Sequence, residues 1–137
     1  MSNNLQGISH ITLIVKDIEK TALLFKNLFN GKEIYDSKVK NFSYSREKFF
    51  LINNIWFAIM EGSVDLPKNY NHIAFKIDEQ YYENYLSKIQ DLNLEIRKTR
   101  SRISGESKSI YFYDYDNHLF ELHTGTLEER LKEYHRI

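Results

Sequence analysis

Two segments of this chain repeat one pattern, and the repetition limits the possible folds more than any other feature. "SHITLIVKD" begins at Ser9 and "NHIAFKIDE" begins at Asn71, and each combines a small polar residue, a histidine, a hydrophobic run and an acidic residue. An internal repeat indicates that one supersecondary unit has been used twice. His10 and His72 therefore occupy equivalent positions of two related units.

The elements that follow each histidine also correspond. Apolar residues recur at helical spacing over residues 18–29 and 81–92, and each of these segments ends at a turn. Three strand-like segments then follow in each unit: residues 32–37, 42–52 and 55–60 in the first, and residues 94–99, 109–115 and 119–123 in the second.

The sequence therefore predicts an α+β fold built from paired βαβββ units. We expect one domain over residues 1–137, with the first repeat at about 7–62, the second at about 69–125 and a C-terminal helix at about 126–136. Asn53-Asn54 is typical of a two-residue hairpin turn. Thr126 and Glu129 have the spacing of a capping box at the start of the last helix.

Composition is that of an ordinary globular protein. The chain has 137 residues, of which 42% are hydrophobic and 28% charged, and its nineteen basic and nineteen acidic residues give no net charge. We therefore expect no nucleic-acid or membrane partner. The N-terminus has no signal-peptide pattern, so we expect a cytoplasmic protein. There is no cysteine, so any metal must be bound by nitrogen and oxygen.

Three residues are candidate metal ligands. A single histidine in a strand is usually structural, but His10 and His72 would meet at the same cleft of a symmetric pair of units. Glu121 lies in the apolar run "LFELHTG", where a carboxylate is costly to bury unless it is paired or bound to metal. Two imidazoles and one carboxylate suit Mn²⁺, Fe²⁺, Co²⁺, Ni²⁺ or Zn²⁺ and leave open positions for substrate. His123, two residues further on the same strand face, could support the ligands, but a packing role is favoured.

A second carboxylate lies between two cations in "NFSYSREKFF". Alternation along a strand places Glu47 on the face of Phe49 and Leu51, and Arg46 and Lys48 on the other face. The pattern alone leaves two interpretations open: a solvated group of charges near a strand end, or a carboxylate placed for chemistry.

Three segments of the chain closely resemble the fosfomycin-resistance proteins of the vicinal oxygen chelate superfamily: "SHITLIVKD", "YNHIAF" and "SIYFYDYDNHLFELHTGTLEERL". The resemblance covers nearly the whole chain. It implies a metal-binding cleft with His10, His72 and Glu121 as ligands of Mn²⁺ or another divalent metal. It also implies a domain-swapped homodimer in which His10 completes the site of the other chain.

The segment "SYSREKFFLI" resembles the FosX branch of this family, in which a glutamate acts as general base. The resemblance implies that Glu47 activates a water molecule that opens the epoxide of fosfomycin to a diol, with the metal as Lewis acid. The residues that match substrate contacts of the family are Thr12, Trp56, Arg102, Ser109, Tyr111 and Arg130.

Other functions remain open on this fold. One is a thiol transferase of the glutathione or bacillithiol type, which would also act on fosfomycin but need a thiol. Another is a metal-free drug-binding module of the bleomycin-resistance type, against which three intact ligands count. A third, an extradiol-type dioxygenase with Fe²⁺, fits the short chain and its basic pocket less well.

Overall fold

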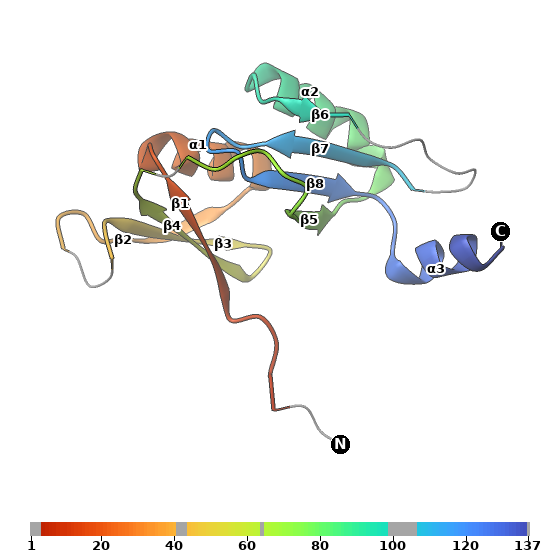
Figure 1. The fold of residues 1–137 in the computed structure, drawn as a ribbon, viewed down its shortest axis with the longest axis horizontal. Coiled ribbons are helices and arrows are strands. Elements are labelled where there is room, and N and C mark those ends of the chain that lie inside the picture. Colours follow the sequence, from red (N-terminus) through yellow and green to blue (C-terminus); the bar gives the residue numbers. More distant parts are fainter. Residues whose placement is uncertain (1–3, 41–43, 64, 99–106, 137) are drawn as a thin grey trace. The chain divides into compact units, whose positions relative to one another are not determined.

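A computed structural model describes residues 4–40, 44–63, 65–98 and 107–136. The chain divides into two compact units, Met1–Asp65 and Leu66–Ile137, which correspond to the two sequence repeats (Figure 1). The predicted order of elements, β-α-β-β-β, is confirmed in each unit.

The first unit is a four-stranded sheet with one helix. The strands are in the order β1-β4-β3-β2, with β1 and β4 parallel and the other pairs antiparallel. The elements are β1 (His10–Val15), α1 (Ile18–Phe29), β2 (Lys32–Asp36), β3 (Glu47–Ile52) and β4 (Ile55–Glu61).

The second unit repeats this topology, with strands in the order β5-β8-β7-β6 and a parallel pair formed by β5 and β8. A short 3₁₀ turn precedes its helix, and a further helix follows the last strand. The elements are β5 (His72–Lys76), η1 (Glu79–Tyr81), α2 (Tyr82–Asp91), β6 (Ile96–Arg97), β7 (Ser109–Tyr113), β8 (Leu119–His123) and α3 (Leu127–Arg136).

Local signals fix the ends of α1. The Asp17 side chain accepts a hydrogen bond from the Lys20 amide at 3.0 Å, and Asn30 ends the helix in the left-handed conformation at φ 53°. Phe25 packs edge-on against Phe50 and Phe57, with ring centroids 5.4 and 5.9 Å away. The helix therefore covers one face of the first sheet, and the other face is not covered by it.

The predicted turns are confirmed. Asn53 and Asn54 have φ values of 47° and 65°, the two positive values that a type I′ hairpin requires. At the start of α3, the Glu129 amide donates to the Thr126 hydroxyl at 3.2 Å, as expected for a capping box.

Some predicted boundaries are wrong. The strand predicted from residue 42 begins only at Glu47, because β2 ends at Asp36 and offers no partner beyond it; Tyr44 is 86% exposed and residues 41–43 lie outside the described part. Of the strand predicted over 94–99, the described part up to residue 98 forms only Ile96–Arg97, which pairs with two residues of β7.

The second unit also has a distinct apolar face. Phe120 stacks on Phe112 and Phe75, with centroids 5.8 and 6.3 Å away, and Ile89 of α2 is fully buried. Side chains at alternate positions of β5, β7 and β8 point to the opposite face. In the described part of the chain, no helix is both long and apolar enough to span a bilayer.

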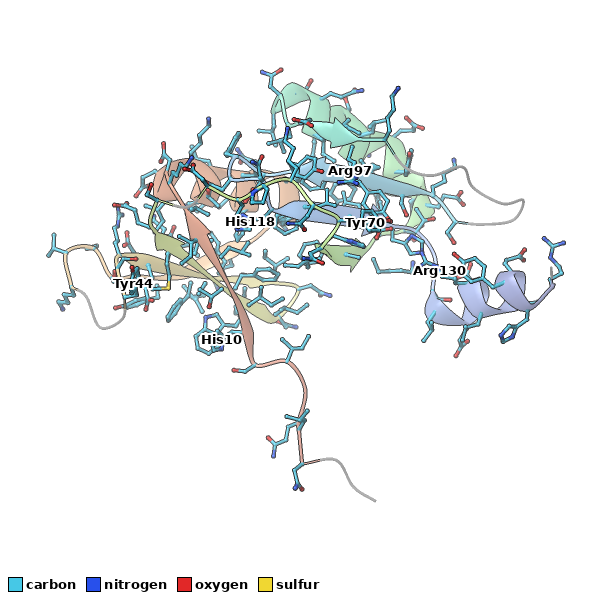
Figure 2. The ribbon with its side chains drawn as sticks, in the orientation of Figure 1. His10, Tyr44, Tyr70, Arg97, His118 and Arg130 are labelled. Atoms are coloured by element: carbon cyan, nitrogen blue, oxygen red, sulfur yellow. The ribbon has the colours of Figure 1, made fainter. Side chains whose placement is uncertain are left out.

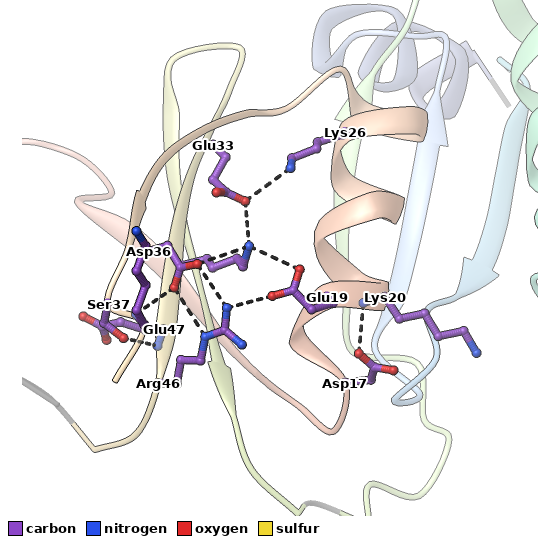
Figure 3. Close-up of polar contacts among 11 residues, drawn as sticks. Asp17, Glu19, Lys20, Lys26, Glu33, Asp36, Ser37, Arg46 and Glu47 are labelled. Carbon is purple, nitrogen blue, oxygen red and sulfur yellow. Dashed lines mark hydrogen bonds and ion pairs between the residues drawn. The ribbon is translucent and has the colours of Figure 1, made fainter. Parts of the chain in front are cut away.

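A cluster of ion pairs lies between β3 and α1 (Figure 3). The Lys48 side chain is only 6% exposed, and its Nζ lies 3.0 Å from Glu33 Oε1 and 3.5 Å from oxygens of both Glu19 and Asp36. Arg46 joins the cluster at 2.7 Å from Glu19 and 3.0 Å from Asp36. Buried charges of this kind are tolerated only when they are paired.

Asp36 gives this cluster a measurable pH dependence. Hydrogen bonds from Arg46 lower the pKa of Asp36 from 3.8 to about 2. Because the pKa is lower in the folded protein, the stabilisation is complete above about pH 4 and is lost as the pH falls towards 2.

We expect Asp36→Asn to lower the free energy of unfolding by about 1 to 2 kcal/mol at pH 7. The difference from the wild type should shrink between pH 4 and pH 2 in urea unfolding. Asp65→Asn is the control, because Asp65 is 96% exposed in its pair with Lys16 and should have little effect. A difference between the two proteins that stays constant down to pH 2 would contradict this account.

Candidate metal and substrate site

The first unit places its predicted site residues on the sheet face opposite α1. His10 lies beside Trp56 in register, with ring centroids 4.2 Å apart, and Phe49 packs edge-on against Trp56 at 5.1 Å. Because side chains alternate along a strand and the strands are in register, Thr12 and Glu47 lie on the same face as these residues. Figure 2 shows His10 on β1 near the N-terminal end of the strand.

The predicted side of Glu47 is confirmed. Arg46 and Lys48 both contact the carboxylates on the helix side, so Glu47 points away from its cationic neighbours. The backbone of Glu47 is fixed by Ser37, whose hydroxyl accepts the Glu47 amide at 3.0 Å and whose amide donates to the Glu47 carbonyl at 3.0 Å.

The Glu47 side chain is buried and has no partner among the described residues. The residue is 9% exposed, and its carboxylate has no hydrogen bond or ion pair within the described ranges of the chain. Its cross-strand neighbour, Met60, carries no proton donor. Glu47 pairs with Met60 of β4, whereas His10 on β1 pairs with Trp56, four residues earlier on β4. The carboxylate and the imidazole therefore lie at opposite ends of the open face.

The second unit brings His72 and Glu121 together. His72 Nε2 lies 3.1 Å from Glu121 Oε1, and His72 Nδ1 lies 2.7 Å from the Tyr70 carbonyl oxygen. Because a carbonyl only accepts, Nδ1 carries a hydrogen, and Nε2 faces the carboxylate. Either a hydrogen on Nε2 or a metal ion bound by both groups stabilises this pair.

This arrangement fits a divalent metal. A ligating histidine typically donates its second ring nitrogen to a carbonyl or carboxylate, as His72 does to Tyr70. Neighbouring ligands in an octahedral shell are about 3 Å apart when each metal–ligand distance is about 2.1 Å. His72 and Glu121 have this spacing. Within the described residues, no group of three or more such ligands is found.

The second oxygen of Glu121 is held by Ser109. The Ser109 hydroxyl donates to Glu121 Oε2 at 2.6 Å and lies 2.7 Å from His123 Nδ1. Ser109 was predicted to contact substrate, and in this structure its hydroxyl is already engaged by protein groups. The Glu121 side chain is only 5% exposed, so the bond is shielded from water.

His123 does more than pack, so the favoured packing role is wrong and the alternative, a role in supporting the ligands, agrees better with its contacts. Both ring nitrogens make polar contacts: Nδ1 with Ser109, and Nε2 with Arg130 Nη2 at 3.3 Å. The signal was its parity, since His123 shares the face of Glu121 and lies directly opposite Ser109 in the β7–β8 ladder.

His72, Glu121, His123 and Arg130 line a cavity of about 280 Å³ between β5, β8 and the start of α3. Arg130 reaches it from the second turn of α3, where Figure 2 shows its position. The guanidinium is the cation expected to bind an oxyanion. The remaining side chains at the cavity wall that carry polar groups are His72, Glu121, His123 and Thr126.

Tyr111 lies beside the His72 ring with its hydroxyl bonded to Tyr70. The Tyr70 hydroxyl donates to the Tyr111 oxygen at 2.9 Å, and the Tyr111 and His72 ring centroids are 5.3 Å apart. Burial and the nearby Glu121 carboxylate raise the pKa of Tyr111, so it remains a neutral phenol that can donate. Tyr70, which holds both Tyr111 and His72, was not predicted from sequence.

The structure says less about two other predicted substrate contacts, Arg102 and Trp56. Arg102 lies outside the described residues. The indole nitrogen of Trp56 is buried and has no hydrogen-bond partner among the described groups, so it is a donor at the open face of the first sheet.

Comparison with known families and proteins identifies close relatives. Residues 7–122 match the family model of the Glyoxalase/Bleomycin resistance protein/Dioxygenase superfamily. The fosfomycin resistance protein FosX of Listeria innocua is 54% identical over 132 residues, which cover 96% of this chain and 99% of the relative. The metallothiol transferase FosB of Staphylococcus saprophyticus is 36% identical over 95% of this chain and 84% of the relative.

A solved structure is also similar over nearly its full length. It is a crystal structure of a mutant FosX from Listeria monocytogenes complexed with Mn(II) and 1S,2S-dihydroxypropylphosphonic acid. The TM-score is 0.87 at 52% identity, and the match covers 96% of this chain and 99% of the other.

We expect His72→Ala to remove most of the stabilisation that Mn²⁺ gives to the protein. A metal present at about 100 times its dissociation constant stabilises the folded state by about 2.7 kcal/mol. This gain should be seen as a rise in Tm of the wild type and be largely absent in the variant. His135→Ala is the matched control, since His135 lies exposed on α3. An equal gain in all three proteins would contradict the assignment of His72 as a ligand.

Proposed function

Because this chain belongs to the glyoxalase/bleomycin resistance protein/dioxygenase superfamily, we propose that it is a fosfomycin-resistance enzyme of the FosX type. In this proposal, the enzyme adds water to the epoxide of fosfomycin, or of a related phosphonate, and releases a vicinal diol. The observation that carries the proposal is the full-length similarity to FosX, together with the carboxylate of Glu47, which has no partner among the described residues and lies on an open sheet face.

The proposed metal site consists of His72 and Glu121, with His10 supplied by a second copy of the chain in a homodimer. The exposure of His10 supports this arrangement. Mn²⁺ is the proposed metal, because a relative binds it in its crystal structure. The bound metal would supply a Lewis acid that stabilises negative charge on the epoxide oxygen as the ring opens.

Glu47 is the proposed general base. Its carboxylate would take a proton from water while the water oxygen forms a bond to a ring carbon and the carbon–oxygen bond of the epoxide breaks. The epoxide oxygen then receives a proton, which gives the diol. A diol phosphonate of this kind is the ligand in the similar crystal structure.

The phosphonate would be bound by donors around the cavity of the second unit. Arg130 offers a planar fork of N–H groups that matches an oxyanion. Tyr111 offers a phenol that burial keeps protonated. Thr12, Trp56 and Arg102 complete the proposed set of donors, and Arg102 belongs to it by sequence similarity alone. Ser109, whose hydroxyl hydrogen goes to Glu121, would support the site through that carboxylate.

Product analysis tests this reaction. With Mn²⁺ and no thiol, the purified protein should convert fosfomycin to the diol, which ³¹P NMR distinguishes from the epoxide and from a thiol adduct. Adding glutathione, cysteine or bacillithiol should not raise the rate. If turnover required a thiol, the protein would be a thiol transferase like the FosB relatives, and the hydrolase proposal would be wrong.

We expect Glu47→Gln to lose ~10²–10⁴-fold in kcat, the usual contribution of a general base, while its affinity for Mn²⁺ stays near that of the wild type. The control is Glu61→Gln, because Glu61 is an exposed carboxylate of the same unit, on the other face of β4. Stopped assays by ³¹P NMR give kcat, and a metal titration gives the affinity. Wild-type hydrolysis by the Glu47 variant would exclude this residue as the base.

A further inference from the structure

A continuous row of polar contacts joins Arg130 on α3 to Glu121 on β8. Arg130 Nη2 lies 3.3 Å from His123 Nε2, and His123 Nδ1 lies 2.7 Å from the Ser109 hydroxyl. The hydroxyl in turn lies 2.6 Å from Glu121 Oε2. The register of β7 and β8 holds the middle of this row, since Ser109 and His123 are directly opposite each other.

The chemistry of the two ends fixes the direction of every bond in the row. A guanidinium can only donate and an ionised carboxylate can only accept. His123 Nε2 therefore accepts from Arg130, so the neutral imidazole carries its hydrogen on Nδ1 and donates it to Ser109. The hydroxyl is then free to donate to Glu121. One arrangement of hydrogens satisfies all three bonds.

A further distance agrees with this arrangement. His123 Nδ1 lies 3.3 Å from Glu121 Oε2, and an N–H at that position is attracted by the carboxylate, whereas a lone pair would be repelled. The side chains of His123 and Glu121 are 14% and 5% exposed, so water has little access to replace a lost bond.

We propose that His123 is a positioning residue that, through Ser109, makes the hold on the Glu121 carboxylate depend on Arg130. This inference rests on the proposed function in one respect, the role of Glu121 as a metal ligand. Without the Arg130 contact, the hydrogen of His123 can move to Nε2, and Nδ1 then accepts the hydrogen of Ser109. Glu121 Oε2 loses its donor, and the carboxylate is free to turn away from His72.

The row therefore connects Arg130, which would bind the anion, to Glu121, which would bind the metal, without a direct contact between these two side chains. An oxyanion bound by Arg130 uses N–H groups of the same guanidinium that orients His123. The state of the anion site is thereby transmitted to the carboxylate that faces His72. Mutation of a residue that orients a metal ligand typically lowers metal affinity by about 10- to 100-fold.

The first test reads the imidazole directly. In metal-free protein labelled with ¹⁵N in histidine, the nitrogen shifts of His123 should show hydrogen on Nδ1 in the wild type. In Arg130→Met, the shifts should move towards the Nε2–H form. A wild type with hydrogen on Nε2, or a tautomer that is identical in both proteins, would overturn the inference.

The second test is a double-mutant cycle on Mn²⁺ affinity, followed by electron paramagnetic resonance without any anion. Arg130→Met and His123→Phe should each weaken binding about tenfold. The double variant should bind Mn²⁺ as tightly as His123→Phe does. The phenyl ring fills the same space but makes no hydrogen bond, so Arg130 no longer acts on Ser109 and its removal has no further effect. Effects that multiply in the double variant would mean that the two residues act independently, and the inference would fall.

Two further variants separate this role from simple structural support. Ser109→Thr keeps the hydroxyl and should keep near wild-type Mn²⁺ affinity, whereas Ser109→Ala should lose about tenfold or more. Arg136→Met, at the exposed end of α3, should change neither affinity nor tautomer. Equal losses in Ser109→Thr and Ser109→Ala would contradict a role for the hydroxyl.

The outcomes also separate this inference from the proposed reaction. If the protein hydrolyses fosfomycin but the effects of Arg130 and His123 are independent, only this inference is wrong. If the tautomer and the mutant cycle are as expected but no diol forms, only the proposed reaction is wrong. A wild type that does not bind Mn²⁺ overturns the metal site and its link to this row, whatever the tautomer.

Discussion

The buried ammonium of Lys48 is the constraint on which the first unit depends. A cation that is 6% exposed must be paired, and three carboxylates from α1, β2 and the end of β2 surround it. Because side chains alternate along a strand, fixing Lys48 on the helix side forces Glu47 to the other side. The charge cluster therefore keeps three acidic side chains occupied and leaves the carboxylate of Glu47 unpaired on the open face. Packing of α1 and orientation of the proposed base follow from one interaction.

Much of this arrangement could be predicted from the sequence, because it depends on periodicity. The repeat around His10 and His72 predicted two equivalent units, and parity predicted the side of Glu47. The Asn53-Asn54 turn was predicted from the conformations that asparagine tolerates, and both residues have positive φ. The family resemblance supplied the proposed ligands and the proposed base, which neither periodicity nor composition could assign to a reaction.

The contacts that were missed are those that depend on cross-strand register and on backbone atoms. Parity places His123 on the face of Glu121, but only the β7–β8 ladder places it opposite Ser109. The carbonyl that orients His72 belongs to Tyr70, and no side-chain pattern reveals which carbonyl a ring nitrogen meets. The short β6 was overestimated because the alternation of "LEIRKT" says nothing about whether a partner strand continues beside it.

The two halves have diverged at equivalent positions, and the ladders show where. Glu47 opposite Met60 in the first unit corresponds to Ser109 opposite His123 in the second. Next to these pairs, Ala58 corresponds to Glu121. In the second unit, donors from β7 and β8 therefore hold a carboxylate that lies on β8. In the first unit the carboxylate is on β3 itself, and its neighbours, a thioether and a methyl group, cannot donate to it. A held carboxylate suits metal binding, and an unpaired one suits proton abstraction. One duplicated scaffold thus provides the two carboxylate environments that a metal-assisted hydration requires.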